Sequence, residues 1–151
     1  MDFLQPTSLA DAIATKAEFP GAVPIAGGTD VMVEINFDTR RPEALLDLNR
    51  VPEVASWQLS DGLVRLGAGV TYTRLIAELG SLLPGLAMAA RTIGSPQIRN
   101  RGTVGGNLGA ASPAGTRSPI RGCALMLSAM SSQLSDLKAV STAAWRAVGP
   151  G

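Results

Sequence analysis

The chain has no histidine and a single cysteine, Cys123, among its 151 residues. No disulfide can form within the chain, and four-cysteine iron–sulfur sites and Cys/His zinc sites are excluded. Without histidine, the Ser–His and Cys–His catalytic pairs are excluded as well. We therefore predict no metal site. Any redox chemistry must use an organic cofactor, with any metal centre on another chain.

Charge and long apolar runs are also scarce. Charged residues make up 17% of the chain, aromatic residues 4%, and the net charge is +1. This balance gives no case for binding nucleic acid or a membrane surface. No apolar run is long enough to span a bilayer, and Asp2, Gln5 and Pro6 interrupt the start where a signal peptide would lie. We expect a cytoplasmic protein with no nucleic-acid or membrane partner.

The remaining composition is that of a globular protein. Hydrophobic residues make up 46%, and the length suffices for one ordinary domain with a sizeable core. Residues 1–55 alternate between short apolar strands, near 3–4, 23–26 and 44–48, and helical patterns. The first helix is capped by Thr7 or Ser8 and stops near Phe19. Strand, helix, strand, helix, strand predicts a small parallel lobe with right-handed crossovers.

The pattern changes to an antiparallel one in residues 56–115. Asp61-Gly62 lies between apolar runs at 57–59 and 63–66, which is a standard hairpin signal. A helix capped by Thr71 and a second helix from about 84 to 93 follow. We predict that this region begins a second α+β lobe.

Glycines follow the apolar strand at 23–26. Gly27 and Gly28 precede Thr29, Asp30 and a short helical pattern. Consecutive N–H groups that converge before a helix form an anion site, and Thr29 is the predicted cap. Asp30 would repel a phosphate, so we expect it to point away. A plain strand-to-helix turn is the alternative interpretation.

A second, longer glycine-rich stretch occupies residues 92–115. Its glycines are too many for an ordinary strand or helix: Gly102, Gly105, Gly106 and Gly109. They suit backbone brought close to a ligand, with side-chain donors from Thr103, Asn107 and Ser112. Arg99 and Arg101 suit phosphate. A long surface loop and a solvated basic pair remain the simpler alternatives.

Both stretches resemble a known family. IGSPQIRNRGTVGGNLGAASPAG resembles the second flavin-binding segment of the FAD-binding subunit or domain of the xanthine dehydrogenase and carbon monoxide dehydrogenase family of molybdenum hydroxylases. PIAGGTDV is similar to the first FAD segment of that family, which holds the cofactor diphosphate. The resemblance covers about residues 1–115. It implies an α+β, two-lobed FAD-binding fold of PCMH-like type, with a small parallel βαβ lobe and a mixed or antiparallel lobe.

The resemblance also implies a function and a set of contacts. FAD on this chain would take electrons from a molybdenum cofactor on a large subunit through [2Fe–2S] clusters on a small subunit. It would pass them to NAD+, oxygen or another acceptor. The chain would be an oxidoreductase subunit, inactive in isolation, with no catalytic residue of its own because the flavin would do the chemistry. The implied FAD contacts are Ala26, Gly27, Gly28, Thr29, Asp30, Ile93, Gly94, Thr103, Val104, Gly105, Gly106 and Asn107.

The resemblance ends after Gly115. The family normally has an aspartate next, where this chain has Thr116, a poorer partner for flavin ribityl hydroxyls. Residues 1–115 hold nine basic and eleven acidic side chains, whereas residues 116–151 hold four basic and one acidic. One interpretation of this tail is an amphipathic helix over about 122–146. We favour a frameshifted translation that ends early, which the other two reading frames of the coding DNA would test.

A frameshift would leave a truncated fold, without the rest of the second lobe or the C-terminal domain of the family. Two further functions therefore stay open. One is a non-functional or partner-docking remnant without stable FAD. The other is a module that binds another phosphorylated ligand through the same two glycine stretches.

Overall fold

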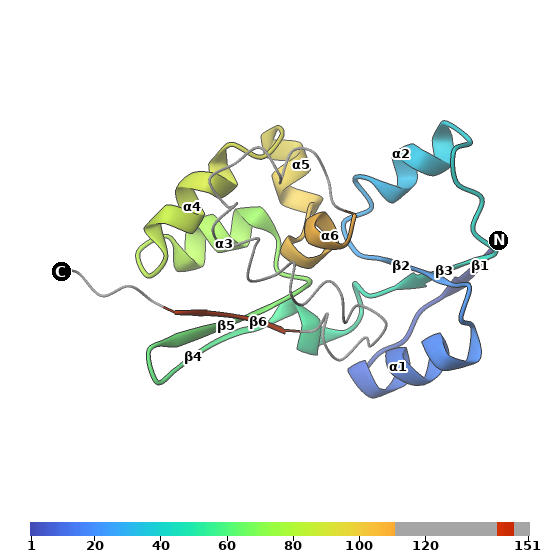
Figure 1. Cartoon of the computed structure of the whole chain (residues 1–151), viewed down its shortest axis with the longest axis horizontal. Coiled ribbons are helices and arrows are strands. Elements are labelled where there is room, and N and C mark those ends of the chain that lie inside the picture. The colour runs from blue at the N-terminus through green and yellow to red at the C-terminus, as the bar shows by residue number, and fades with distance from the viewer. Residues whose placement is uncertain (111–141, 147–151) are drawn as a thin grey trace.

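The structure is a computed structural model that describes residues 1–110 and 142–146. It contains two three-stranded sheets, one parallel and one antiparallel, with helices packed around them (Figure 1). The described part of the chain therefore has the predicted α+β architecture, with a parallel unit first and antiparallel strands after it.

The parallel sheet has the strand order β1-β3-β2, formed by β1 (Asp2–Leu4), β3 (Ala44–Asp47) and β2 (Val23–Ile25). Helix α1 (Leu9–Glu18) joins β1 to β2, and α2 (Val31–Asn36) joins β2 to β3. The two helices lie on opposite sides of the sheet (Figure 1). All four residues of the central strand β3 are buried, as expected for a parallel strand covered on both faces.

The caps of α1 follow the sequence closely. Ser8, not Thr7, is the N-cap, and its hydroxyl accepts a hydrogen bond from the Asp11 N–H. Lys16 Nζ donates to the carbonyls of Pro20 and Ala22 just beyond the helix. The predicted Thr29 cap of α2 is wrong. Asp30 occupies the N-cap position and makes no side-chain cap bond, and no residue of α2 is buried.

The antiparallel sheet has the order β4-β5-β6. A 3₁₀ turn, Pro52–Ala55, leads into β4 (Trp57–Ser60), which pairs with β5 (Leu63–Gly67). Asp61 and Gly62 both have positive φ, 53° and 71°, which matches the two-residue hairpin predicted from the sequence.

The third strand of this sheet, β6 (Thr142–Arg146), pairs antiparallel with β5. An amphipathic helix that continues to Arg146 is therefore wrong for residues 142–146, because the edge of β5 draws them into the sheet. The rest of that predicted helix, with Thr116 and Cys123, lies outside the described residues.

Two helices, α3 (Tyr72–Leu79) and α4 (Pro84–Arg91), cover one face of the antiparallel sheet (Figure 1). Thr71 caps α3 as predicted, accepting from the Arg74 N–H at 3.3 Å. Strands and helices share the largest hydrophobic core, whose fully enclosed members include Val64, Leu66, Val70, Leu75, Leu79 and Ala90.

The glycine-rich stretch forms two short helices, α5 (Pro96–Arg101) and α6 (Val104–Gly109). The expectation that its glycines exclude a helix is wrong. Ser95 and Thr103 cap the helices, accepting from the N–H groups of Ile98 and Gly106, and these side-chain caps offset the cost of glycine.

A charged cluster joins the hairpin to α3. Glu78 accepts from Arg74 Nε at 2.8 Å and from Trp57 Nε1 at 2.7 Å. The bond from Arg74, and then that from Trp57, lowers the pKa of Glu78 to about 2. Because the folded pKa is lower than the ordinary 4.5, the carboxylate stabilises the fold above that value. The stabilisation is lost as the pH falls toward 2.

We expect Glu78→Gln to lower the melting temperature at pH 7 by a small amount, as for other exposed pairs. The difference from the wild type should shrink between pH 4.5 and 2. Thermal melts followed by circular dichroism at both ends of this range measure it. Glu18→Gln, at the end of α1, is the control. An equal loss in melting temperature at pH 7 and near pH 2 would contradict the role given to the ionised carboxylate.

Candidate functional site

The two glycine segments meet at Gly27. A Cβ atom added there would lie 2.7 Å from the Arg101 carbonyl carbon, 3.0 Å from Gly102 Cα and closer still to the Arg101 oxygen. A Cβ atom added at Gly102 would lie 3.8 Å from Thr29 Oγ1. The fold thus brings together two segments about 75 residues apart in sequence, and α5 and α6 lie beside the loop after β2 (Figure 1).

The first segment presents main-chain donors. Gly28 has a φ of +75°, which glycine adopts without strain. Within residues 1–110, the N–H groups of Gly27, Gly28, Thr29 and Asp30 have no hydrogen-bond partner. All four residues are half-buried. Consecutive unpaired donors of this kind attract anionic oxygens.

The buried carboxylate of Asp47 is linked to this segment through Asn49. Asp47, 6% exposed at the end of β3, accepts from Gln5 Nε2, from Asn49 N and from Asn49 Nδ2. Burial raises the pKa of Asp47, but these hydrogen bonds and the charge of Arg50 outweigh it and hold the pKa below its usual value. Asn49 Nδ2 also donates to the Ala26 carbonyl at 3.0 Å. The Asn49 amide therefore fixes the start of the first segment.

Asn49→Ala should lower the free energy of unfolding by about 1 kcal/mol, because Asp47 and the Ala26 carbonyl each lose a donor. Urea denaturation measures the change. The control is Asn36→Ala, at the exposed end of α2, which should leave stability unchanged or slightly higher. Equal stability of Asn49→Ala and the wild type would show that the Asn49 hydrogen bonds to Asp47 and Ala26 do not stabilise the fold.

The second segment differs from expectation. Its N–H groups are used within the fold: Val104 donates to Val70 O, Gly105 to Ala68 O, and Asn107 to Thr103 O. Gly106 N donates to Thr103 Oγ1 at 3.1 Å. The expectation that these N–H groups are free for an anion is wrong for these four residues, because the segment starts a helix packed against the turn after β5. Of residues 103–107, the Thr103 N–H, the Thr103 hydroxyl proton and the rest of the Asn107 amide have no partner within residues 1–110, and Thr103 is 4% exposed.

Arg99 has a structural task in place of the predicted contact with phosphate. Its Nη1 donates to the carbonyls of Arg91, Ile93 and Gly94 at 2.9 to 3.1 Å. Ile93 and Gly94 lie at the start of α5, a helix about 9 Å long, whereas the contact with Gly27 is at its end. Arg101 is exposed and its guanidinium makes no hydrogen bond or ion pair within residues 1–110, while its main chain lies against Gly27.

Tyr72 lies at the junction of the two segments. It is 4% exposed, its N–H donates to Gly102 O at 3.2 Å, and its hydroxyl oxygen accepts from Asn107 Nδ2 at 2.6 Å. Burial raises the pKa of Tyr72 to about 12, the Asn107 hydrogen bond opposes the rise, and the negative charge of Asp30 adds to it. Tyr72 was not among the site residues predicted from the sequence. The available signal was a tyrosine on an apolar helix face, whose buried hydroxyl needs a partner.

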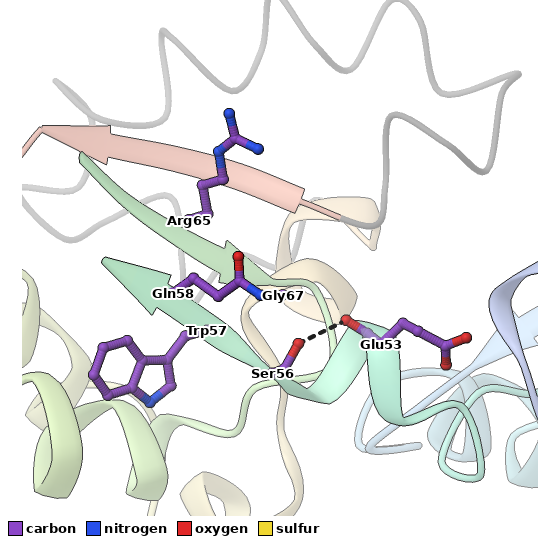
Figure 2. Close-up of a pocket in the computed structure, with 6 residues that line it drawn as sticks. All are labelled: Glu53, Ser56, Trp57, Gln58, Arg65 and Gly67. Carbon is purple, nitrogen blue, oxygen red and sulfur yellow. Dashed lines mark hydrogen bonds between the residues drawn. The ribbon is translucent and has the colours of Figure 1, made fainter. Parts of the chain in front are cut away.

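The described residues hold other features that do not form this site. A cavity of about 260 Å³ lies on the β4–β5 hairpin, lined by Glu53, Ser56, Trp57, Gln58, Arg65 and Gly67 (Figure 2). None of its lining residues belongs to either glycine segment.

In residues 1–110 no three His, Cys, Asp or Glu side chains are grouped to hold a metal ion. None of the described helices has the length and apolarity needed to cross a membrane.

Comparison with known proteins decides the family. The family described as "FAD binding domain in molybdopterin dehydrogenase" matches residues 1–144. The chain belongs to this family. The match confirms the resemblance inferred from the two glycine segments and extends beyond Gly115, where the sequence alone suggested that the resemblance ends. The lobe boundaries and the frameshift in the tail stay predictions.

Relatives of this FAD-binding family agree. The chain is 35% identical over 118 residues to the nicotinate dehydrogenase FAD-subunit of Eubacterium barkeri, covering 76% of this chain and 40% of the relative. It is 39% identical over 104 residues to the putative xanthine dehydrogenase FAD-binding subunit XdhB of Escherichia coli K12, covering 67% and 36%.

Solved structures share the fold. Carbon monoxide dehydrogenase from Hydrogenophaga pseudoflava matches with a TM-score of 0.69 at 33% identity, covering 72% of this chain and 39% of that one. Quinoline 2-oxidoreductase from Pseudomonas putida 86 gives 0.70 at 32%, with the same coverage. These matches confirm the predicted fold class. The chain spans about two fifths of the length of the relatives it matches.

Proposed function

We propose that this chain binds FAD between its two glycine segments and forms part of an electron-transfer subunit of a molybdenum hydroxylase. The observation that carries the proposal is the row of unpaired N–H groups from Gly27 to Asp30, packed against Arg101–Gly102 in a member of this family. Such a row suits the two phosphates of FAD better than it suits an uncharged ligand.

The residues fit the cofactor unevenly. The first segment offers main-chain donors for the diphosphate, and Arg101 adds a positive charge beside it. The Thr103 hydroxyl and the Asn107 amide offer side-chain donors from the second segment. Asp30 opposes the phosphate charge, and Thr29 Oγ1 lies 3.4 Å from its Oδ2, where it donates to the carboxylate. When bound, FAD would supply the electron-transfer chemistry, and the role of these residues is to bind and orient it.

The partners follow from the family. Relatives of this chain are named as FAD-binding subunits and as a carbon monoxide dehydrogenase medium chain. We propose that a molybdopterin-binding large subunit and a [2Fe–2S] small subunit supply the electrons. The acceptor is NAD+, oxygen or another oxidant. The chain itself contributes no catalytic acid or base, and we expect no turnover without its partners.

The visible absorption spectrum of the purified chain tests this proposal, after FAD is added and the excess is removed. We expect flavin bands that stay with the protein and bleach when dithionite is added. A colourless protein that nevertheless binds ADP would support the module for another phosphorylated ligand. A colourless protein that binds neither would support the remnant without stable FAD.

A further inference from the structure

Tyr72 is the only tyrosine in the chain, and it contacts the second glycine segment at two places, Gly102 and Asn107. Its N–H donates to Gly102 O, the residue against which Gly27 packs. Its ring edge is near Gly102, since a Cβ added at Gly102 would lie 3.7 Å from Tyr72 Cδ2. Its hydroxyl oxygen holds the Asn107 amide.

The Tyr72–Asn107 bond is partly buried and directional. At 2.6 Å it is short for a neutral pair, and Tyr72 is almost fully enclosed. The amide N–H of Asn107 that points at Tyr72 fixes the plane of the whole amide, so the second N–H and the carbonyl oxygen also have set directions. Neither of these two groups has a hydrogen-bond partner within residues 1–110. They are left for something outside the described residues.

We propose that Tyr72 is a positioning residue for FAD, whose hydroxyl orients the Asn107 amide toward the bound cofactor. The inference rests on the proposed function, since it assigns a role within the same FAD site. Tyr72 acts through Asn107 and does not itself touch the reacting ring. A Cβ added at Gly102 would lie 3.7 Å from Tyr72 Cδ2 and 3.8 Å from Thr29 Oγ1, so the first segment approaches the same point as the Tyr72 ring.

Tyr72→Phe tests the proposal because it removes only the hydroxyl and keeps the ring in the core. We expect FAD to dissociate about tenfold more readily, as when a buried polar group loses its partner. Flavin fluorescence titration of the full chain measures the dissociation constant. The matched control is Thr73→Val, which removes another α3 side-chain bond, Thr73 Oγ1 to Asn100 Oδ1 at 2.6 Å. It should bind FAD within about twofold of the wild type.

A double-mutant cycle separates positioning from general destabilisation. Asn107→Ala should weaken FAD binding, and Tyr72→Phe should add nothing to it, because the hydroxyl then has no amide to orient. Additive losses in the double variant would overturn the proposal. So would an unchanged dissociation constant for Tyr72→Phe.

A spectroscopic readout covers the case in which a variant folds poorly. Because Tyr72 is the only tyrosine, 3-fluorotyrosine labels this position alone in the otherwise unaltered chain. Its ¹⁹F resonance should shift on addition of FAD, with the same midpoint as flavin binding. Bound FAD without any shift would overturn the proposal for Tyr72. If the unaltered chain binds no FAD, the proposed function fails first, and the two failures are thereby distinguished.

Discussion

Gly27→Ala should abolish FAD binding and lower the free energy of unfolding by about 3 kcal/mol, the upper range for overpacking a close contact. The added methyl group would overlap the main chain of Arg101 and Gly102. A main chain cannot move aside as the end of a flexible side chain can, so α5 must shift away from the first segment. The unpaired N–H groups of the first segment would then no longer lie against Arg101 and Gly102. Urea denaturation and flavin retention measure the two effects.

Gly21→Ala is the control for this substitution. It lies just before the same strand, β2, and its nearest neighbour would be the Glu43 side chain at an ordinary 3.8 Å. We expect it to retain wild-type FAD binding and nearly wild-type stability. A Gly27→Ala protein that is as stable as this control and keeps its flavin would contradict the close packing of the two segments.

Gly105→Ala should lower the free energy of unfolding by about 2 kcal/mol. An added Cβ would lie 2.8 Å from Ala68 Cα, 2.9 Å from Ala68 O and closer still to Ala68 Cβ. It would also strain the bond from Gly105 N to Ala68 O, which fixes the start of α6. FAD affinity should fall with stability, because α6 carries Asn107. Calorimetry and flavin titration of the same sample follow both.

Two further variants sharpen this test. Adding Ala68→Gly to Gly105→Ala removes the closest clash and should restore part of the lost stability. Gly109→Ala, in the same helix and with no described residue within 4 Å of the added atom, should raise stability by about 0.5 to 1 kcal/mol. If Gly105→Ala behaves as Gly109→Ala does, the close approach of α6 to the turn after β5 is wrong.

The regular elements were readable from local sequence. The 61–62 turn, the cap at Ser8 and the Thr71 cap each depend on residues within a few positions, so their patterns carried the information. The two glycine segments were also recognisable, because glycine where main chains approach closely leaves a local signature. That both segments contribute to one FAD site was implied by the family resemblance, whereas their contact at Gly27 was not predicted from the sequence.

What could not be read depends on contacts between distant residues. The packing of α5 and α6 determines that Arg99 donates to three main-chain carbonyls. It also determines that the N–H groups of residues 104–107 are paired within the fold. The bridge from Asp47 through Asn49 to Ala26 joins two strands. The strand at 142–146 exists because β5 offers an edge for it. Propensity within a short window does not contain such information.

The measurement that tests the central claim most directly is a binding titration of the whole chain with FAD, with riboflavin and with ADP. We propose that the N–H groups of the first segment bind FAD through its two phosphates. We therefore expect that FAD binds, that ADP displaces FAD, and that riboflavin, which has no phosphate, binds far more weakly than FAD. Riboflavin binding as tight as that of FAD, or FAD binding unaffected by ADP, would contradict the account.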